Sequence, residues 1–287
     1  MIINNNQSNI KDSDQVFYLV TKKHISYRKN GFTAHHSHII KKNNGTFINK
    51  NTGEIISNVK NSKLKIENQQ SLIRSYRKLF YTIENYIDAY KNSIMITLGY
   101  NNAQTDFKEL SHDFDNFMKR LNRYIHKKHP TYNYEYIRIN EPYEKPADNG
   151  KPKWHVHLIL LGIDFLFIDD VQKLWGHGKV YITSYADRSG DSVAQYFCSF
   201  LNASEQTNSK EPLDIKRSSK KRRLKYYNSG TDLFSTSRGV KTPKFRRGIF
   251  GEIKKEHPGK TINEGSKTIV IDNKVVNRFD YLNQELL

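Results

Sequence analysis

The sequence predicts an α+β protein that combines an antiparallel sheet with helices. Two segments carry apolar residues at three- and four-residue steps, which is typical of amphipathic helices. Short apolar or alternating runs, which are typical of strands, lie between and after them. Strand, helix, strand and strand follow one another in this order, which favours an antiparallel sheet over a parallel one.

The elements can be assigned in chain order. Apolar periodicity predicts a first helix over 70–90, and the compact apolar run at 94–99 predicts a core strand. A second helix is expected over 107–126. The alternating segment 134–141 predicts another strand, and a turn-rich link, 142–152, leads to the strand after it.

The strand with the clearest signal runs from Val156 to Leu161 and has no breaker before Gly162. Downstream, a tight turn at 174–178 is expected to lead into one more strand. The segment 191–201 then predicts a helix that Asp191 or Ser192 can cap. The stretch after Lys254 has weaker signals and predicts a strand or two, or a tail.

Changes in composition divide the chain into three parts. Residues 1–65 are polar and rich in turn signals, and they predict an appendage of short strands and turns. Residues 66–250 carry the predicted domain, and 251–287 form a C-terminal extension. The appendage contains His35, His36 and His38, which we interpret as a polar loop because no carboxylate or cysteine flanks them.

The net charge of +18 and the sequence pI of about 9.7 indicate a polyanionic partner, and 18 Tyr and 15 Phe offer stacking surfaces for unpaired bases. An anionic membrane surface is the competing partner, but no long basic amphipathic helix supports it. No apolar run is long enough to span a bilayer and no signal peptide is evident. The single cysteine excludes a disulfide framework. These features predict a soluble cytoplasmic protein that binds nucleic acid and not membranes.

Two histidines on the clearest strand form half of a potential metal site. His155 and His157 are two residues apart, so they share one face of the strand. Glu141 ends the preceding strand and supplies a third ligand if it pairs with His155; a slip of one residue would move it to the other face. Two imidazoles and one carboxylate suit Mn²⁺ or Mg²⁺ acting on a phosphate. The alternatives are a hydrogen-bonded histidine pair and an exposed carboxylate at the end of a strand.

Tyr196 is a candidate nucleophile on the 191–201 helix. A phenol has a pKa near 10, so it must be oriented and deprotonated close to a cation in order to attack. The alternative interpretation is a core aromatic residue, because Tyr196 shares an apolar side of the helix with Val193 and Phe197. Cys198 has no electropositive neighbour in the sequence and is expected to be a small core residue.

A basic segment follows this helix, from Lys210 to Lys225. We expect phosphate contacts from it, because it adds to a chain that is already strongly basic and adjoins two tyrosines. The predicted DNA-binding residues are Lys216, Arg217, Lys220, Lys221, Arg222 and Arg223, together with Arg238 further along the chain. A solvated charged face without a partner is the alternative.

These motifs together resemble the HUH endonuclease superfamily and, within it, the rolling-circle replication initiators of plasmids and phages. The resemblance covers roughly 72–247. It is carried by Ile96-Thr97-Leu98, His155-Val156-His157, the helix with Tyr196, Leu174-Trp175-Gly176-His177-Gly178 and Phe234-Ser235-Thr236-Ser237-Arg238-Gly239-Val240. It implies an RRM-like palm, which is a central antiparallel sheet of about five strands with flanking helices, and a metal ion, Mn²⁺ or Mg²⁺, held by His155, His157 and Glu141.

The same resemblance implies a nickase and ligase for single-stranded DNA at a replication origin. Tyr196 would attack the scissile phosphate, leaving a 5′-phosphotyrosine link and a free 3′-OH primer, and a later transesterification would rejoin the strand. A host helicase and polymerase are implied further partners, and an oligomer is compatible with this role. Other functions left open are a single-tyrosine transposase, a mobilisation relaxase of the same superfamily, and a non-catalytic nucleic-acid-binding protein.

The sequence departs from the family pattern at two positions. Many relatives carry a lysine three residues after the tyrosine, where this chain has Ser199. Others carry a second tyrosine four residues on, where this chain has Phe200, which predicts a single-tyrosine mechanism. Tyr181 and Tyr185 are reserve nucleophiles on the preceding strand and turn.

Overall fold

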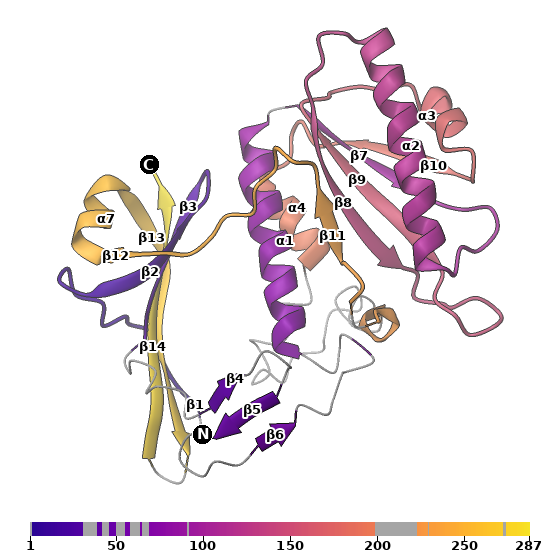
Figure 1. The fold of residues 1–287 in the computed structure, drawn as a ribbon. Coiled ribbons are helices and arrows are strands. Elements are labelled where there is room, and N and C mark those ends of the chain that lie inside the picture. The colour runs from indigo at the N-terminus through magenta and orange to yellow at the C-terminus, as the bar shows by residue number, and fades with distance from the viewer. Residues whose placement is uncertain are drawn as a thin grey trace. The chain divides into compact units, whose positions relative to one another are not determined.

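The computed structural model divides the chain into two compact units, shown in Figure 1. One unit is Ser62–Thr242 and the other combines Met1–Asn61 with Pro243–Leu287. The structure describes residues 2–30, 39–41, 46–49, 55–57, 64, 69–90, 92–198, 223–228, 230–271 and 274–287. Each unit has its own sheet and its own hydrophobic core, so each is described by itself.

The unit Ser62–Thr242 is built on a five-stranded antiparallel sheet with the order β10-β7-β9-β8-β11. Its strands are β7 (Ser93–Leu98), β8 (Glu135–Pro142), β9 (Trp154–Leu161), β10 (Val180–Ser184) and β11 (Phe234–Thr236). The predicted fold class and the first four strands are therefore confirmed. The fifth strand, β11, was not predicted, because three residues are too few for a periodic signal.

Helices cover both faces of this sheet, with α1 and α4 on one side and α2 and α3 on the other (Figure 1). They are α1 (Gln69–Ala89), α2 (Phe107–Lys128), α3 (Ile168–Trp175) and α4 (Gly190–Cys198). The helices predicted over 70–90 and 107–126 are confirmed. The described part of the 191–201 helix is also helical, whereas α3 was not predicted.

The start of α2 shows how the sequence sets a helix boundary. Asp106 has an extended backbone, and its carboxylate accepts hydrogen bonds from the backbone N–H groups of Lys108 and Glu109. These bonds satisfy donors that have no partner inside the helix. The apolar stripe of α2 is fully buried against the sheet and consists of Leu110, Phe114, Phe117, Leu121 and Ile125.

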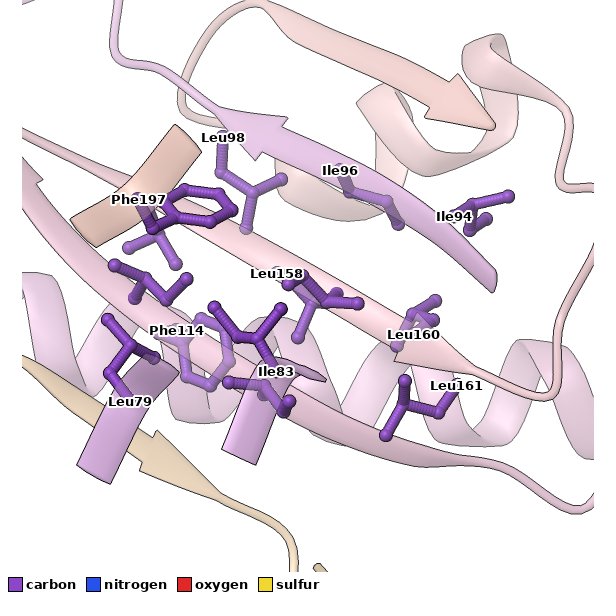
Figure 2. Packing of buried hydrophobic residues seen from close by; sticks show 14 of the residues in the cluster. Leu79, Ile83, Ile94, Ile96, Leu98, Phe114, Leu158, Leu160, Leu161 and Phe197 are labelled. Atoms are coloured by element: carbon purple, nitrogen blue, oxygen red, sulfur yellow. The ribbon is translucent and has the colours of Figure 1, made fainter. Parts of the chain in front are cut away.

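Strand β9 lies at the centre of the sheet, and each of its eight residues is buried. Alternate side chains point to opposite faces, so both faces of this strand contact helices. Figure 2 shows part of the resulting core, in which residues of β7 and β9 lie with Leu79 and Ile83 of α1, Phe114 of α2 and Phe197 of α4. A strand buried on both faces also holds His155 and His157 rigidly.

The second unit contains a six-stranded antiparallel sheet with the order β1-β13-β14-β3-β2-β12. Its strands are β1 (Ile2–Asn5), β2 (Gln15–Val20), β3 (His24–Asn30), β12 (Arg246–Ile249), β13 (Gly259–Ile271) and β14 (Lys274–Leu286). The helix α7 (Phe250–Glu256) completes a small core in which Phe250 and Ile253 lie with Val16, Ile25, Tyr27 and Leu282.

Both ends of the chain enter this sheet. Strand β1 pairs with β13, and β14 pairs with β3, so the N-terminal and C-terminal segments form one unit. A separate small sheet, β4-β5-β6, is formed by Ile39–Lys41, Thr46–Asn49 and Ile55–Ser57. Turn signals predict short strands in the N-terminal segment, but they give no sign that these strands pair with β12, β13 and β14. His35, His36 and His38 lie outside the described residues.

The burial of Leu158 predicts a large loss of stability when its side chain is shortened. Leu158 is fully buried between Ile96 and Arg138 of the neighbouring strands, so Leu158→Ala leaves a cavity and should lower the free energy of unfolding by about 2–5 kcal/mol. Chemical denaturation followed by tryptophan fluorescence measures this unit alone, because both tryptophans, Trp154 and Trp175, lie in it. As a control, Ile168→Ala removes an exposed side chain and should change the value by less than about 0.5 kcal/mol.

Candidate active site

The register of β8 and β9 brings three potential metal ligands to one face of the sheet. Glu141 lies directly opposite His155, which is the pairing that the sequence argument required. His157 is two residues further along β9 and therefore points to the same face. His155 and His157 are each 5% exposed and Glu141 is 9% exposed, so the alternative of an exposed carboxylate at the end of a strand is wrong.

The three side chains converge on one point through Nε2 of each histidine and Oε2 of Glu141. His157 Nε2 lies 3.1 Å from His155 Nε2 and 3.1 Å from Glu141 Oε2, and His155 Nε2 lies 3.5 Å from the same oxygen. Ligands about 2.1 Å from a common ion lie roughly 3.0–3.4 Å from one another. The cluster therefore has the spacing and the chemistry to bind a metal ion.

Neighbouring groups favour the tautomer and the protonation state in which the two imidazoles can bind a metal ion. Thr97 Oγ1 lies 3.0 Å from Nδ1 of His157, so it can accept the Nδ1 proton while Nε2 keeps its lone pair for a cation. Burial lowers the pKa of His155, an effect that Glu141 opposes and that His157 and Arg223 reinforce. The neutral, ligand-competent form of this histidine is thereby favoured. Nδ1 of His155 is buried and has no hydrogen-bond partner among the described residues.

The second oxygen of Glu141 holds an arginine. Arg223 Nη1 lies 3.0 Å from Glu141 Oε1, while Oε2 faces the two histidines. The sequence analysis placed Arg223 in a basic DNA-binding segment and gave no sign of this ion pair. Eighty-two residues separate the two partners, so no local spacing could have revealed it.

Helix α4 lies against the histidine-bearing face. The Phe197 ring is 5.3 Å from the His157 ring and packs edge-on to it, and the Tyr196 ring is 4.9 Å from Phe197. Phe197 is buried, whereas Tyr196 is 50% exposed. The alternative interpretation of Tyr196 as a core aromatic residue is therefore wrong. Cys198 is buried, as expected for a small core residue.

The phenol of Tyr196 lies within electrostatic range of the cluster. Burial raises the pKa of Tyr196 above its usual value and the charge of Glu141 adds to the rise, while Arg223 and Arg188 oppose it. A cation that offsets the charge of Glu141 would therefore favour the phenolate. The arrangement combines a half-exposed hydroxyl with a site that can hold a divalent ion.

Two further tyrosines differ from Tyr196 in their surroundings. Tyr185 is 4% exposed, and its hydroxyl hydrogen-bonds to the sulfur of Met95, which leaves it a core residue. Tyr181 is 60% exposed on β10 and stands opposite Thr97. Tyr143, which sequence reasoning missed, lies against His155 with ring centroids 4.3 Å apart. The alternation that places Glu141 on this face also points to Tyr143, two residues later.

Of the other predicted DNA-binding residues, the structure describes Arg238. Arg238 is exposed in the turn after β11. Lys216, Arg217, Lys220, Lys221 and Arg222 lie outside the described residues, as do Ser199 and Phe200. Among the described helices, none has the length and apolar composition that a transmembrane span requires.

One comparison with known proteins found a match, and it covers the stretch of chain that carries the site. A family model described as replication-associated protein ORF2 matches residues 93–203. This span runs from β7 through α4 and includes Glu141, His155, His157 and Tyr196. The match supports a role in DNA replication and is consistent with a replication initiator of the Rep type. Comparison with curated proteins and with solved structures found no match.

The geometry of the cluster predicts that divalent ions stabilise the protein. Mn²⁺ at one hundred times its Kd should raise the free energy of unfolding by about 2.7 kcal/mol, because only the folded chain assembles the three ligands. Thermal unfolding with Mn²⁺ or with EDTA measures the shift. His157→Gln should abolish it, whereas His177→Gln, which changes a half-exposed imidazole beside Asp113, should leave it intact. A shift that persists in His157→Gln would place the ion elsewhere.

Proposed function

We propose that this protein initiates rolling-circle replication by nicking single-stranded DNA and later rejoining it. The observation that carries the proposal is that the half-exposed Tyr196 phenol lies within electrostatic range of Glu141, on a helix whose Phe197 packs on His157. The family match over 93–203 supports a replication role and covers all of these residues. The net charge of +18 suits a DNA substrate.

The proposed reaction is an attack by the Tyr196 oxygen on the phosphorus of a phosphodiester. A bond forms between the phenolic oxygen and phosphorus while the bond from phosphorus to the 3′-oxygen breaks. The phenol proton passes to water, which reaches the half-exposed side chain, and the departing 3′-oxygen takes a proton from water. The products are a 5′-phosphotyrosine and a 3′-OH that can prime synthesis. Attack by an incoming 3′-OH reverses the step and rejoins a strand.

Each protein residue has a defined task in this scheme. Glu141, His155 and His157 would hold Mn²⁺ or Mg²⁺, which supplies positive charge to a phosphate oxygen when bound. Thr97 orients His157, and Tyr143 packs on the ring of His155. Phe197 packs on His157 and so holds the last turn of α4 against the sheet. The neighbouring Tyr196 side chain is half exposed, where a DNA strand would reach it. Arg238 and the basic segment that includes Lys216, Arg217, Lys220, Lys221 and Arg222 would contact the backbone of the DNA.

Loss of the Tyr196 hydroxyl should abolish a covalent protein–DNA adduct. The full chain is incubated with a labelled random-sequence pool of single-stranded DNA and Mn²⁺ or Mg²⁺, and adducts that survive denaturing electrophoresis are counted. We expect wild type to form adducts, Tyr196→Phe to form none above background, and peptide mass spectrometry to find the nucleotide on Tyr196.

Tyr132→Phe is the matched control, since the Tyr132 hydroxyl hydrogen-bonds to Asp164, which follows the end of β9 remote from His155. It should keep the activity of wild type. Adducts that persist in Tyr196→Phe would assign the nucleophile to another residue. Binding of the DNA pool without any adduct, in either metal, would instead favour a non-catalytic binding protein. A transposase or relaxase would give the same adduct. The sequence of the DNA recovered from the adduct would distinguish these enzymes from a replication initiator.

A further inference from the structure

Arg223 is held in the site by a short segment that docks on the ends of β8 and β9. It immediately precedes the 3-10 helix η2 (Leu224–Tyr226), in which Leu224 is buried in the main core. Tyr227 is also buried, and its hydroxyl donates to the backbone oxygen of Asn140, the residue before Glu141. The Tyr227 ring packs edge-on against Trp154, the residue before His155. The anchors of this segment are therefore the neighbours of two cluster residues.

The carboxylate of Glu141 is divided between two kinds of partner. Its Oε2 faces the two histidines, and its Oε1 lies 3.0 Å from Arg223 Nη1 in an ion pair. The ion pair is made through Oε1, so Oε2 remains directed at the two histidines, where a metal ion would bind.

The guanidinium has capacity for another acceptor. It carries five N–H donors, and Nε is buried without a hydrogen-bond partner among the residues that the structure describes. The side chain is 22% exposed, so it is not sealed inside the protein. A buried donor without a partner is uncommon, and an acceptor on a bound ligand would account for the unused capacity of this guanidinium.

The net charge of the site indicates which acceptor fits the unused donors of Arg223. With neutral histidines, the charges of Glu141 and Arg223 cancel, and a bound divalent ion leaves the site at +2. A phosphodiester beside the neutral phenol of Tyr196 carries one negative charge in total. Loss of the phenol proton to water and attack on phosphorus raise this to two. Without Arg223 the site would stand at +1, which matches the state before attack but not the five-coordinate state. Interactions that are stronger in the transition state are those that raise the rate.

We propose that Arg223 is a phosphate-binding residue of this site, held by Glu141 Oε1 so that its remaining donors contact the phosphodiester that Tyr196 attacks. The inference rests on the proposed function, since it names the group that binds the substrate at the same site. The charge of Arg223 already reaches the Tyr196 phenol, where it opposes the rise in pKa that burial and Glu141 cause. The same residue therefore acts on the nucleophile and on the group that is attacked.

The test uses the full chain with Arg223→Gln, Arg223→Lys and a matched control, Arg123→Gln, which removes an exposed arginine of α2 on the other side of the sheet. Single-turnover adduct formation should slow by about 100-fold or more in Arg223→Gln, by less in Arg223→Lys, and by under about twofold in Arg123→Gln. Added guanidinium ion should partly restore Arg223→Gln, and an equal concentration of sodium chloride should not.

A second measurement does not require nicking. Phenyl phosphate, which mimics the phosphotyrosine ester, is titrated with Mg²⁺ present and followed by calorimetry. Arg223→Gln should weaken its binding by about tenfold or more, and Arg123→Gln should not change it. Mn²⁺ titration provides the control for folding and ligand geometry. Arg223→Gln should bind Mn²⁺ as well as or better than wild type, because a positive charge is removed, whereas Glu141→Gln should bind it less well.

The outcomes separate this inference from the proposed function. Equal affinity of wild type and Arg223→Gln for phenyl phosphate overturns the phosphate-binding role, even if wild type nicks DNA. A loss of Mn²⁺ affinity in Arg223→Gln as large as that in Glu141→Gln also overturns it, because Arg223 would then act only by holding the carboxylate. If wild type forms no adduct but binds phenyl phosphate through Arg223, the nicking proposal fails and the phosphate site stands.

Discussion

The site depends on the register between β8 and β9. Side chains alternate along a strand, so Glu141 joins the two histidines on one face only when it pairs with His155. A slip by one residue would send the carboxylate to the face covered by α2 and separate it from both imidazoles and from Arg223. Burial of every residue of β9 makes such a slip costly, because its apolar set would change faces as well. The packing of the core thus fixes the relative positions of Glu141, His155 and His157.

Much of this unit follows from patterns that are local in the sequence. The periodicity of α1 and α2 and the apolar runs of β7 and β9 extend over enough residues to define type and position, and the alternation in β8 and β9 placed Glu141 with the histidines. Short elements such as α3 and β11 carry too few residues for a periodic signal. The exposure of Tyr196 could not be predicted from the sequence either. Tyr196 shares an apolar side of its helix with Phe197, and only the packing of the helix shows which of the two rings is buried.

Contacts between distant segments account for what the sequence did not reveal. The ion pair joins Arg223, just before a short 3-10 helix, to Glu141 near the end of β8. From the sequence alone, any acidic residue of the chain could have been the partner of Arg223. The docking of Tyr227 on Asn140 that holds Arg223 there is equally non-local. The six-stranded sheet shows the same limit on a larger scale. The weak signals after Lys254 predicted a strand or two, but nothing in them specified β1 and β3 as partners.

The pairing of the two ends of the chain has a consequence for the order of events on the ribosome. The unit that carries the candidate active site is contiguous, Ser62–Thr242, so it can begin to fold while later residues are still being synthesised. Strands β2 and β3 emerge early but gain β12, β13 and β14 only after Pro243 onward has left the exit tunnel. Closing so long a loop slows their assembly. The nascent protein would therefore hold an assembled Glu141–His155–His157 cluster before its six-stranded sheet exists, with the edges of β2 and β3 open to chaperones in the interval.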